Sequence, residues 1–243
     1  VLKAGQKIAI EINLMREEIK TKAVPYFGML PNNETGYIKL NGFTDNCSQE
    51  VKEALLNLKG KGCKNLVLDL RGNLGGLLHE AVNIVNFFID KGQEVVFTKG
   101  KVPDWDKTYL AVNNPIDTQI PLIVLVDENS ASASEIVSGA LQDVDRALII
   151  GKRTFGKGLV QQTKDLVYNA KIKITVAKYY IPSGRCVQAL NYSTKDEDGR
   201  VEKVPDSLIT AFKTKAGRIV YDGAGIMPDV KTTDEKYSMA LAS

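Results

Sequence analysis

Along most of this chain, segments with the hydrophobic pattern of a strand alternate with segments that have the hydrophobic spacing of a helix. Short apolar runs at 65–70 and 121–126 are typical of strands buried in a sheet. Each run is followed by a stretch with helical spacing of apolar residues, at 77–90 and at 133–142. The same reasoning predicts further elements: strands at 37–40, 94–98 and 147–150 and a helix at 51–58. Strands that alternate with helices predict an α/β fold with a largely parallel core sheet.

The pattern changes towards both ends. Residues 171–180 alternate apolar and polar side chains, which predicts an exposed or half-exposed strand. Near the start, residues 7–13 alternate loosely, with Ile8, Ile10 and Ile12 apolar, so a short strand is expected there, before a charged linker. The polar stretch around Trp105 and the charged stretch 194–205 are expected to be loops.

Composition narrows the class of protein. The chain has 243 residues, 44% hydrophobic and 25% charged, as in an ordinary globular protein. A net charge of only +3 argues against a dedicated nucleic-acid binder. The three cysteines, Cys47, Cys63 and Cys186, are widely spaced and form neither a metal-binding pattern nor a disulfide framework. We therefore expect no metal and no cofactor.

Three serines alternate with alanines just after the apolar run that ends at Val126. Ser130, Ser132 and Ser134 lie around the start of a predicted helix, and one of them is expected to cap it. Three are more than capping requires, and the small neighbours would let a substrate backbone approach closely. A serine at a helix N-terminus also has backbone N–H groups nearby that can stabilise an oxyanion. Ser132 is therefore a candidate nucleophile, with capping as the alternative.

A serine nucleophile needs a base to take its proton. The only histidine, His79, lies early in a predicted helix and is expected to be structural. Lys157, on a glycine-flanked turn after the strand at 147–150, is the other candidate base. The stretch 151–157 also matches the start of a phosphate-binding loop, G-x-x-x-x-G-K. Gly158 stands where that motif needs Ser or Thr, so nucleotide binding is the weaker interpretation.

A glycine-rich stretch, 71–76, follows the first buried strand. Such a stretch serves as a flexible turn between strand and helix. It also lies at the carboxyl end of a strand, where ligand sites of α/β sheets are found. We expect this turn to meet the Ser132 turn and to offer backbone N–H donors.

Five motifs in this order carry a resemblance to a known family. They include Ser130-Ala131-Ser132-Ala133-Ser134-Glu135, and together they occupy 69–78, 130–135, 154–161, 179–185 and 223–230. The series resembles the carboxyl-terminal processing peptidases, also called tail-specific proteases. The resemblance implies an α/β core related to the crotonase-like (ClpP/crotonase-type) fold, with a mixed sheet and flanking helices. It also implies a PDZ domain, of which residues 1–22 would hold only the end and a linker, ahead of a core at 23–243.

The resemblance assigns roles to individual residues. Ser132 matches the nucleophile, Lys157 the general base, and Gln161 the residue that orients the lysine. The oxyanion hole would be formed by backbone N–H groups of Gly75, Gly76 and Ala133. The strand at 171–180 would hold substrate as an added β-strand, through Ile174, Val176 and Ala177. Asp143 would be structural.

The implied function is a serine endopeptidase that cleaves proteins near or from their C-terminal tails through an acyl-enzyme. Its partners would be unfolded or tail-exposed proteins, with no nucleic acid, and its location the cell envelope or periplasm. The alternative is a non-catalytic module of the same fold that binds peptides or hydrophobic ligands. The joint presence of Ser132, Lys157 and Gln161 favours the peptidase.

Overall fold

A computed structural model describes residues 5, 7–15, 21–195 and 201–233. Its main sheet has the strand order β1-β2-β3-β6-β7-β14 within these residues. The strands are β1 Tyr26–Met29, β2 Thr35–Lys39, β3 Asn65–Asp69, β6 Leu122–Val126, β7 Leu148–Gly151 and β14 Val230–Lys231. Only the β1–β2 pair is antiparallel among the pairings of this sheet, so the predicted parallel core is confirmed.

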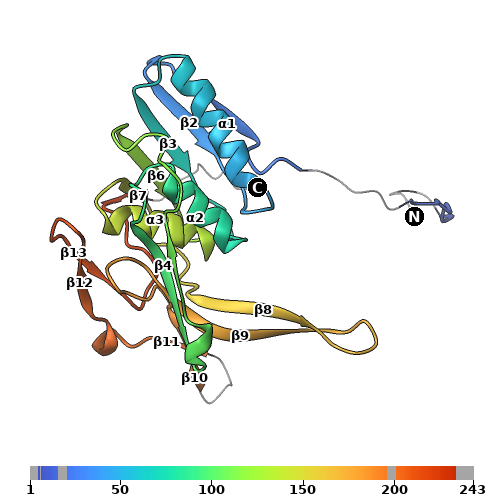
Figure 1. Ribbon diagram of the computed structural model, residues 1–243. Helices are drawn as coiled ribbons and strands as arrows, with labels where there is room; N and C mark the ends of the chain where they lie inside the picture. Colours follow the sequence, from blue (N-terminus) through green and yellow to red (C-terminus); the bar gives the residue numbers. More distant parts are fainter. Residues whose placement is uncertain (1–4, 6, 16–20, 196–200, 234–243) are drawn as a thin grey trace.

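The helices pack together beside this sheet (Figure 1). They are α1 Cys47–Gly60, α2 Leu78–Asn86 and α3 Ala133–Asp143. Strands β2, β3, β6 and β7 are neighbours in chain order, and right-handed crossovers then put all the connecting helices on one face. The contacts of α2 with both α1 and α3 agree with this placement. No helix in the described ranges is long and apolar enough to cross a membrane.

One face of the main sheet carries the core. The side chains of Leu66, Leu68 and Val124 are buried there, together with most of the apolar stripe of each helix. Alternate positions such as Val67 are only half-buried. The run at 65–70 is therefore buried on one face rather than on both, because the helices cover only one side of the sheet.

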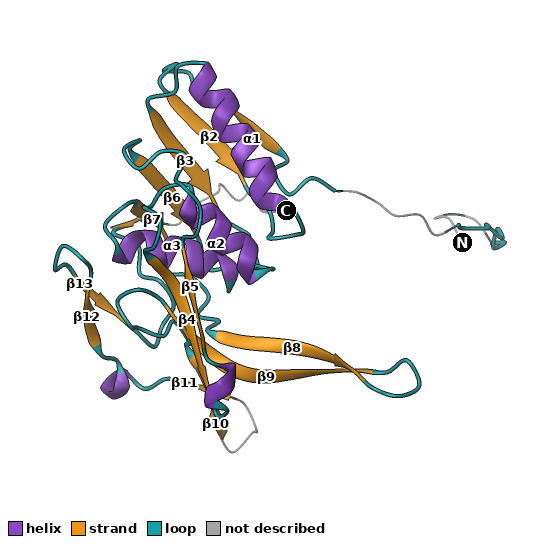
Figure 2. Cartoon of the chain, in the orientation of Figure 1, coloured by secondary structure: helices purple, strands orange, loops and turns teal. Residues whose placement is uncertain are grey.

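A second sheet stands apart from the first and has the order β5-β4-β9-β8 (Figure 2). Its strands are β4 Glu94–Gly100, β5 Lys107–Leu110, β8 Leu159–Asp165 and β9 Lys171–Tyr180. The hairpin of β8 and β9 projects far from the body of the molecule. Every residue from 161 to 175 is exposed, which confirms the exposed strand predicted at 171–180 over its first half.

Several loop predictions were too simple. A 3₁₀ turn, Pro103–Trp105, and strand β5 occupy the stretch expected to be a loop around Trp105. The stretch 194–205 includes the end of β10 Leu190–Lys195 and all of β11 Val201–Lys203, with 196–200 outside the described residues. A further antiparallel pair joins β12 Ala211–Lys213 to β13 Ile219–Tyr221. Most of these strands have only three or four residues, too few for an alternation of apolar and polar positions to be visible.

The strand predicted at 7–13 was wrong. Residues 7–15 have no strand structure, and their apolar side chains are exposed, from 42% at Ile10 to 87% at Met15. An alternating pattern supports a strand only where a neighbouring strand can complete its hydrogen bonds, and no strand in the described part of the chain lies against this segment.

A buried ion pair anchors the C-terminal end of α3. Arg185 Nη2 lies 2.7 Å from Asp143 Oδ1, and both side chains are fully buried. Asp143 Oδ2 also accepts the backbone N–H of Ser183. Burial raises the pKa of Asp143 against the opposing effect of Arg185. Asp143 therefore ties the helix of the candidate nucleophile to the turn at 182–185.

Candidate active site

Three turns meet at one edge of the main sheet. They follow β3, β6 and β7, which are adjacent and parallel, so their carboxyl ends lie side by side. The first turn carries Gly75 and Gly76, the second Ser132 and the third Lys157. Motifs that are far apart in the sequence are brought together by the order of the strands.

Ser132 lies at the N-cap of α3 in a strained conformation, with φ 56° and ψ −112°. Non-glycine residues rarely adopt positive φ, and such strain is concentrated at functional sites. A sharp turn between a strand and a helix is also where α/β-hydrolases hold their nucleophilic serine. The neighbouring Ala131 and Ala133 are buried and leave Ser132 half-exposed.

Gly75 packs directly against the serine turn. A Cβ on Gly75 would lie 2.6 Å from the carbonyl oxygen of Ala131 and 2.8 Å from Ser132 Cβ, so only glycine fits there. The N–H of Gly75 donates to Asn73 Oδ1 at 2.9 Å. The N–H groups of Gly76 and Ala133 make no hydrogen bond within the described residues. Of the three predicted oxyanion donors, two are therefore free and Gly75 is already engaged.

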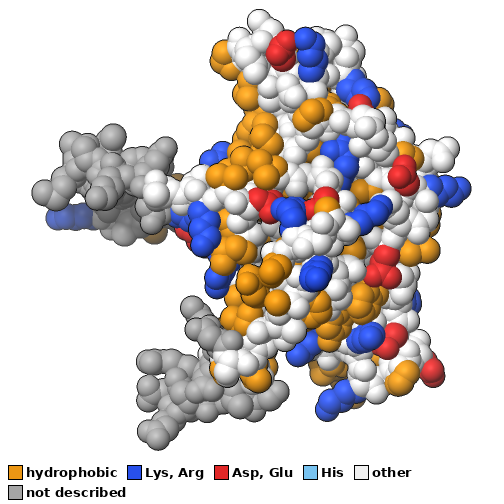
Figure 3. Space-filling model, turned by 90° about the vertical axis from the view of Figure 1, so that its left-hand side faces the viewer, with side chains coloured by type: hydrophobic (Ala, Val, Ile, Leu, Met, Phe, Trp, Pro, Cys, Tyr) orange, Lys and Arg blue, Asp and Glu red, His pale blue; other side chains and the backbone are white. Residues whose placement is uncertain are grey.

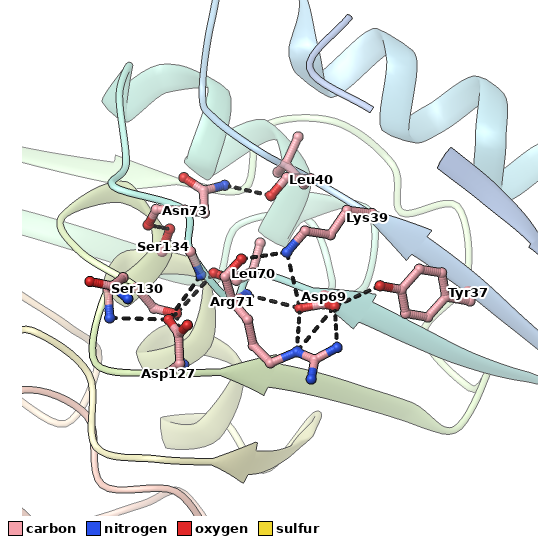
Figure 4. Close-up of polar contacts among 12 residues, drawn as sticks. Tyr37, Lys39, Leu40, Asp69, Leu70, Arg71, Asn73, Asp127, Ser130 and Ser134 are labelled. Carbon is pink, nitrogen blue, oxygen red and sulfur yellow. Dashed lines mark hydrogen bonds and ion pairs between the residues drawn. The ribbon is translucent and has the colours of Figure 1, made fainter. Parts of the chain in front are cut away.

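A hydrogen-bond network locks the glycine turn to the serine turn (Figure 4). The Ser134 hydroxyl donates to the carbonyl of Asn73, and the Ser130 hydroxyl donates to that of Leu70, both at 2.8 Å. Asn73 in turn donates its side-chain amide to the carbonyl of Leu40. Ser130 and Ser134 are thus structural, and Ser132 is the serine of the three whose side chain lines the cavity described below.

Asp69 and Arg71 hold the other side of this network (Figure 4). Arg71 Nη2 lies 2.7 Å from Asp69 Oδ2, and the Tyr37 hydroxyl donates to the same oxygen at 2.6 Å. Burial alone would raise the pKa of Asp69, but hydrogen bonds from Arg71 and Tyr37 outweigh burial and lower it. The end of β3 is therefore fixed by an ionised carboxylate.

Glu135 joins the serine turn to the lysine turn. Its fully buried carboxylate accepts the backbone N–H groups of Ser132 at 2.8 Å, Gly156 at 2.7 Å and Lys157 at 2.8 Å. The Thr154 hydroxyl donates to it at 2.6 Å. Burial raises the pKa of Glu135, against the opposing effect of these four donors. One side chain thus sets the spacing between the two candidate catalytic turns.

Sequence reasoning missed Glu135, although a signal was present. Ser132-x-x-Glu135 has the form of a capping box, in which the fourth residue reaches back to the backbone N–H of the first. Tyr179 was missed as well, and its hydroxyl lies within hydrogen-bonding distance of the carbonyl oxygens of Ser132 and Lys157. Its place at the start of the 179–185 motif was visible in the sequence, but the position of its hydroxyl between the two turns was not.

The same geometry disfavours the phosphate-loop interpretation of 151–157. The N–H groups of Gly156 and Lys157 are bonded to Glu135, and that of Gly158 donates to Gln188 Oε1 at 2.7 Å. A phosphate cradle needs these groups free and a helix immediately afterwards. The chain continues instead into strand β8.

A cavity of about 420 Å³ brings the predicted catalytic residues together. Its walls share the predicted site residues Gly75, Gly76, Ser132, Ala133, Lys157 and Gln161. The Lys157 side chain is half-buried and has no carboxylate partner within the described residues. Gln161 is exposed, and no hydrogen bond joins Lys157 to Ser132 or to Gln161 in the described structure.

The predicted substrate-binding residues lie elsewhere. Ile174, Val176 and Ala177 do not line this cavity. Ala177 is buried and paired with β8 on one side and β4 on the other, so it has no open edge for an added strand. The open edge beside Ser132 belongs to β8, because within the described residues β8 pairs only with β9. A substrate-binding role of Ile174 and Val176, which the resemblance implies, stays a prediction, whereas Ala177 has no open edge for an added strand.

The profile of peptidase family S41 matches residues 34–196, about two thirds of the chain. The chain belongs to peptidase family S41. This confirms the resemblance to the carboxyl-terminal processing peptidases. The matched range includes the glycine turn, the serine turn, the lysine turn and both strands of the β8–β9 hairpin.

Individual proteins that are similar in sequence carry names that agree with this family. A carboxy-terminal-processing protease of Bartonella bacilliformis is 40% identical over 185 residues, which are 74% of this chain and 42% of that protein. A probable CtpA-like serine protease of Staphylococcus aureus is 41% identical over 224 residues, which are 91% of this chain and 40% of that protein. The S41 chain thus spans about two fifths of the length of these relatives.

Solved structures show the same α/β fold. The photosystem II D1 C-terminal processing protease superposes with a TM-score of 0.65 at 30% identity, covering 89% of this chain and 50% of that one. A lipoprotein of Streptococcus agalactiae gives a TM-score of 0.55 at 16% identity, covering 86% and 66%. The second similarity concerns the fold alone.

Proposed function

We propose that this S41 chain is the catalytic core of a serine endopeptidase that cleaves polypeptides near their C-terminal tails, with Ser132 as nucleophile and Lys157 as general base. The observation that carries the proposal is the strained Ser132 turn at a helix N-terminus. It shares one cavity with Lys157 and with the free N–H groups of Gly76 and Ala133. Nucleophile, base and oxyanion donors are the three parts that acyl transfer requires.

In the proposed mechanism Ser132 Oγ attacks the peptide carbonyl while neutral Lys157 Nζ takes the hydroxyl proton. The N–H groups of Gly76 and Ala133 stabilise the oxyanion that forms. Lys157 then gives its proton to the leaving amine, which departs and leaves an acyl-enzyme on Ser132. A water molecule, deprotonated by Lys157, hydrolyses that ester and restores the serine.

The proposed chemistry requires Lys157 Nζ to come within hydrogen-bonding reach of Ser132 Oγ when substrate is bound. Catalytic hydrogen bonds often tighten only in the complex. The base form of lysine is the uncharged amine. In this proposal Gln161, at the exposed start of β8, turns inward to orient the amine.

The substrate is proposed to lie as an extended strand along the open edge of β8. Strand addition uses the unpaired N–H and C=O groups of a sheet edge and needs an unfolded or tail-exposed polypeptide. We further propose that the core is of the crotonase-like type, since parallel strands in chain order with all helices on one face fit that arrangement. A location in the cell envelope or periplasm is proposed from the family alone.

Mass spectrometry of an unfolded protein with an apolar C-terminal tail tests the proposal. Wild type is expected to release tail fragments, and Ser132→Ala to release none. Ser138→Ala is the matched control, because the Ser138 hydroxyl lies in the same helix and only donates back to the carbonyl of Ser134. Fragments from Ser132→Ala would contradict the assigned nucleophile. Binding of the protein without cleavage by wild type would instead favour the non-catalytic alternative.

A further inference from the structure

A larger cavity lies on the other side of the lysine turn. Its volume is about 770 Å³, which is in the range of sites that bury a ligand. It shares Lys157, Leu159 and Gln161 with the cavity of Ser132, so the start of β8 forms a wall common to both. None of the roles proposed above uses the rest of this larger cavity.

The lining of this second cavity is mostly apolar, and large apolar side chains remain exposed around it. Phe155 is 54% exposed, Tyr192 58% and Leu208 62%. Figure 3 shows that apolar side chains are also exposed at several places on the face of the molecule that carries β12 and β13 in Figure 1. Exposed apolar patches of this kind mark binding surfaces. Lys157, Lys178 and Asp222 also line the cavity, so charges of both signs lie beside the apolar side chains.

We propose that this cavity is a second substrate site, which binds an apolar stretch of the same polypeptide several residues away from the bond that is cut. The inference rests on the proposed peptidase function. A polypeptide held at Ser132 along the open edge of β8 passes Leu159 and Gln161, and these residues lead directly into the second cavity. Continuity with the Ser132 cavity therefore favours the substrate over an unrelated ligand.

The second site would also act on the lysine turn. Gln188, in its wall, accepts the N–H of Gly158, the residue directly after Lys157. An apolar segment that packs against Phe155 and Gln188 restrains the turn on both sides of the lysine. Substrates that fill both cavities are therefore expected to be cut with a higher kcat/KM than substrates that fill only the first.

Matched fluorogenic peptides test the proposal. A short peptide spans only the scissile bond, and longer versions add six apolar or six Gly/Ser residues on either side. We expect the apolar extension on one side to raise kcat/KM by about tenfold, as burial of one or two apolar side chains predicts. Leu208→Asp and Tyr192→Asp should remove that gain and leave the short peptide unaffected. Ile219→Asp, at an equally exposed position outside the cavity, should keep the gain.

An equal kcat/KM for apolar and Gly/Ser extensions, or a gain that survives in both cavity variants, would overturn the second site. Fluorescence anisotropy of the labelled apolar peptide with Ser132→Ala measures binding without turnover. Binding that is weakened by Leu208→Asp supports the second site even if no peptide is cut, in which case the proposed peptidase function alone fails. Binding of the small apolar dye anilinonaphthalene sulfonate, with no effect of peptide extension, would assign the cavity to a small ligand instead.

Discussion

Ser132 and Lys157 line one cavity but belong to regions of opposite character. Ser132 begins a helix in which every residue from Ala133 to Asp143 is buried. The β8–β9 hairpin begins two residues beyond Lys157, and every one of its residues from 161 to 175 is exposed. Backbone segments with few buried contacts open at low free-energy cost. The nucleophile is thus preorganised by the core, whereas the base stands next to a region that can move with substrate.

Replacing Lys157 is expected to have the largest effect on activity. Lys157→Ala and Lys157→Arg should both lower kcat by roughly a thousandfold or more, because alanine removes the base and arginine stays protonated. Initial rates on a peptide substrate, with thermal unfolding as a check on folding, measure the effect. Residual activity in the arginine variant near that of wild type would show that another group takes the proton.

Breaking the buried ion pair between Asp143 and Arg185 tests whether α3 is the more rigid of the two regions. Asp143→Ala leaves Arg185 buried and uncompensated, so the free energy of unfolding should fall by roughly 3–5 kcal/mol. Ile174→Thr, in the exposed hairpin, should change it by less than about 0.5 kcal/mol. Urea unfolding curves give both values. Equal losses would mean that the hairpin is as integral to the fold as α3.

Glu135→Gln tests the link between the two regions. The amide replaces one acceptor oxygen by a donor, so the two groups that donate to that oxygen lose their acceptor, at a cost of roughly 1–3 kcal/mol each in stability. Misplacement of the two turns should lower kcat by up to about a hundredfold with KM little changed. Thr154→Val should reproduce part of this loss and Thr154→Ser should restore it. A change in KM without a change in kcat would contradict the role of Glu135 in positioning the two turns.

The fixed end of β3 predicts a smaller, pH-dependent effect. Since the pKa of Asp69 is lowered in the folded state, its contribution to stability is complete above its unfolded pKa of about 3.9 and is lost as the pH falls through the folded value. The stability advantage of wild type over Asp69→Asn should therefore shrink below about pH 4. Unfolding free energies measured from pH 7 down to pH 3 check this. An advantage that stays constant would mean that Asp69 is not ionised in the fold.

The comparison also explains what could be predicted from the sequence. The turns that carry Gly75, Ser132 and Lys157 follow apolar runs with a clear period, so their meeting at one sheet edge could be anticipated. The second sheet could not, because the place of β8 and β9 depends on pairing with β4 across long stretches of chain. The resemblance assigns Ala177 to substrate binding, but the pairing of β9 with both β4 and β8 leaves Ala177 no open edge.

Glu135 shows a different limit. Its spacing from Ser132 was visible in the sequence, but its bonds to Gly156 and Lys157 arise only once β7 returns the chain to the same edge. The segment at 7–13 failed for the opposite reason, since a loose alternation was visible in the sequence but no described strand lies against it.

Covalent labelling with a fluorophosphonate, followed by peptide mass mapping, tests the assignment of the two catalytic residues most directly. If Ser132 is the nucleophile and Lys157 its base, one adduct is expected on Ser132 in wild type, none in Ser132→Ala, and much slower labelling in Lys157→Ala. An adduct on another residue, or labelling of Lys157→Ala at the wild-type rate, would contradict the assignment of Ser132 as nucleophile and Lys157 as its base.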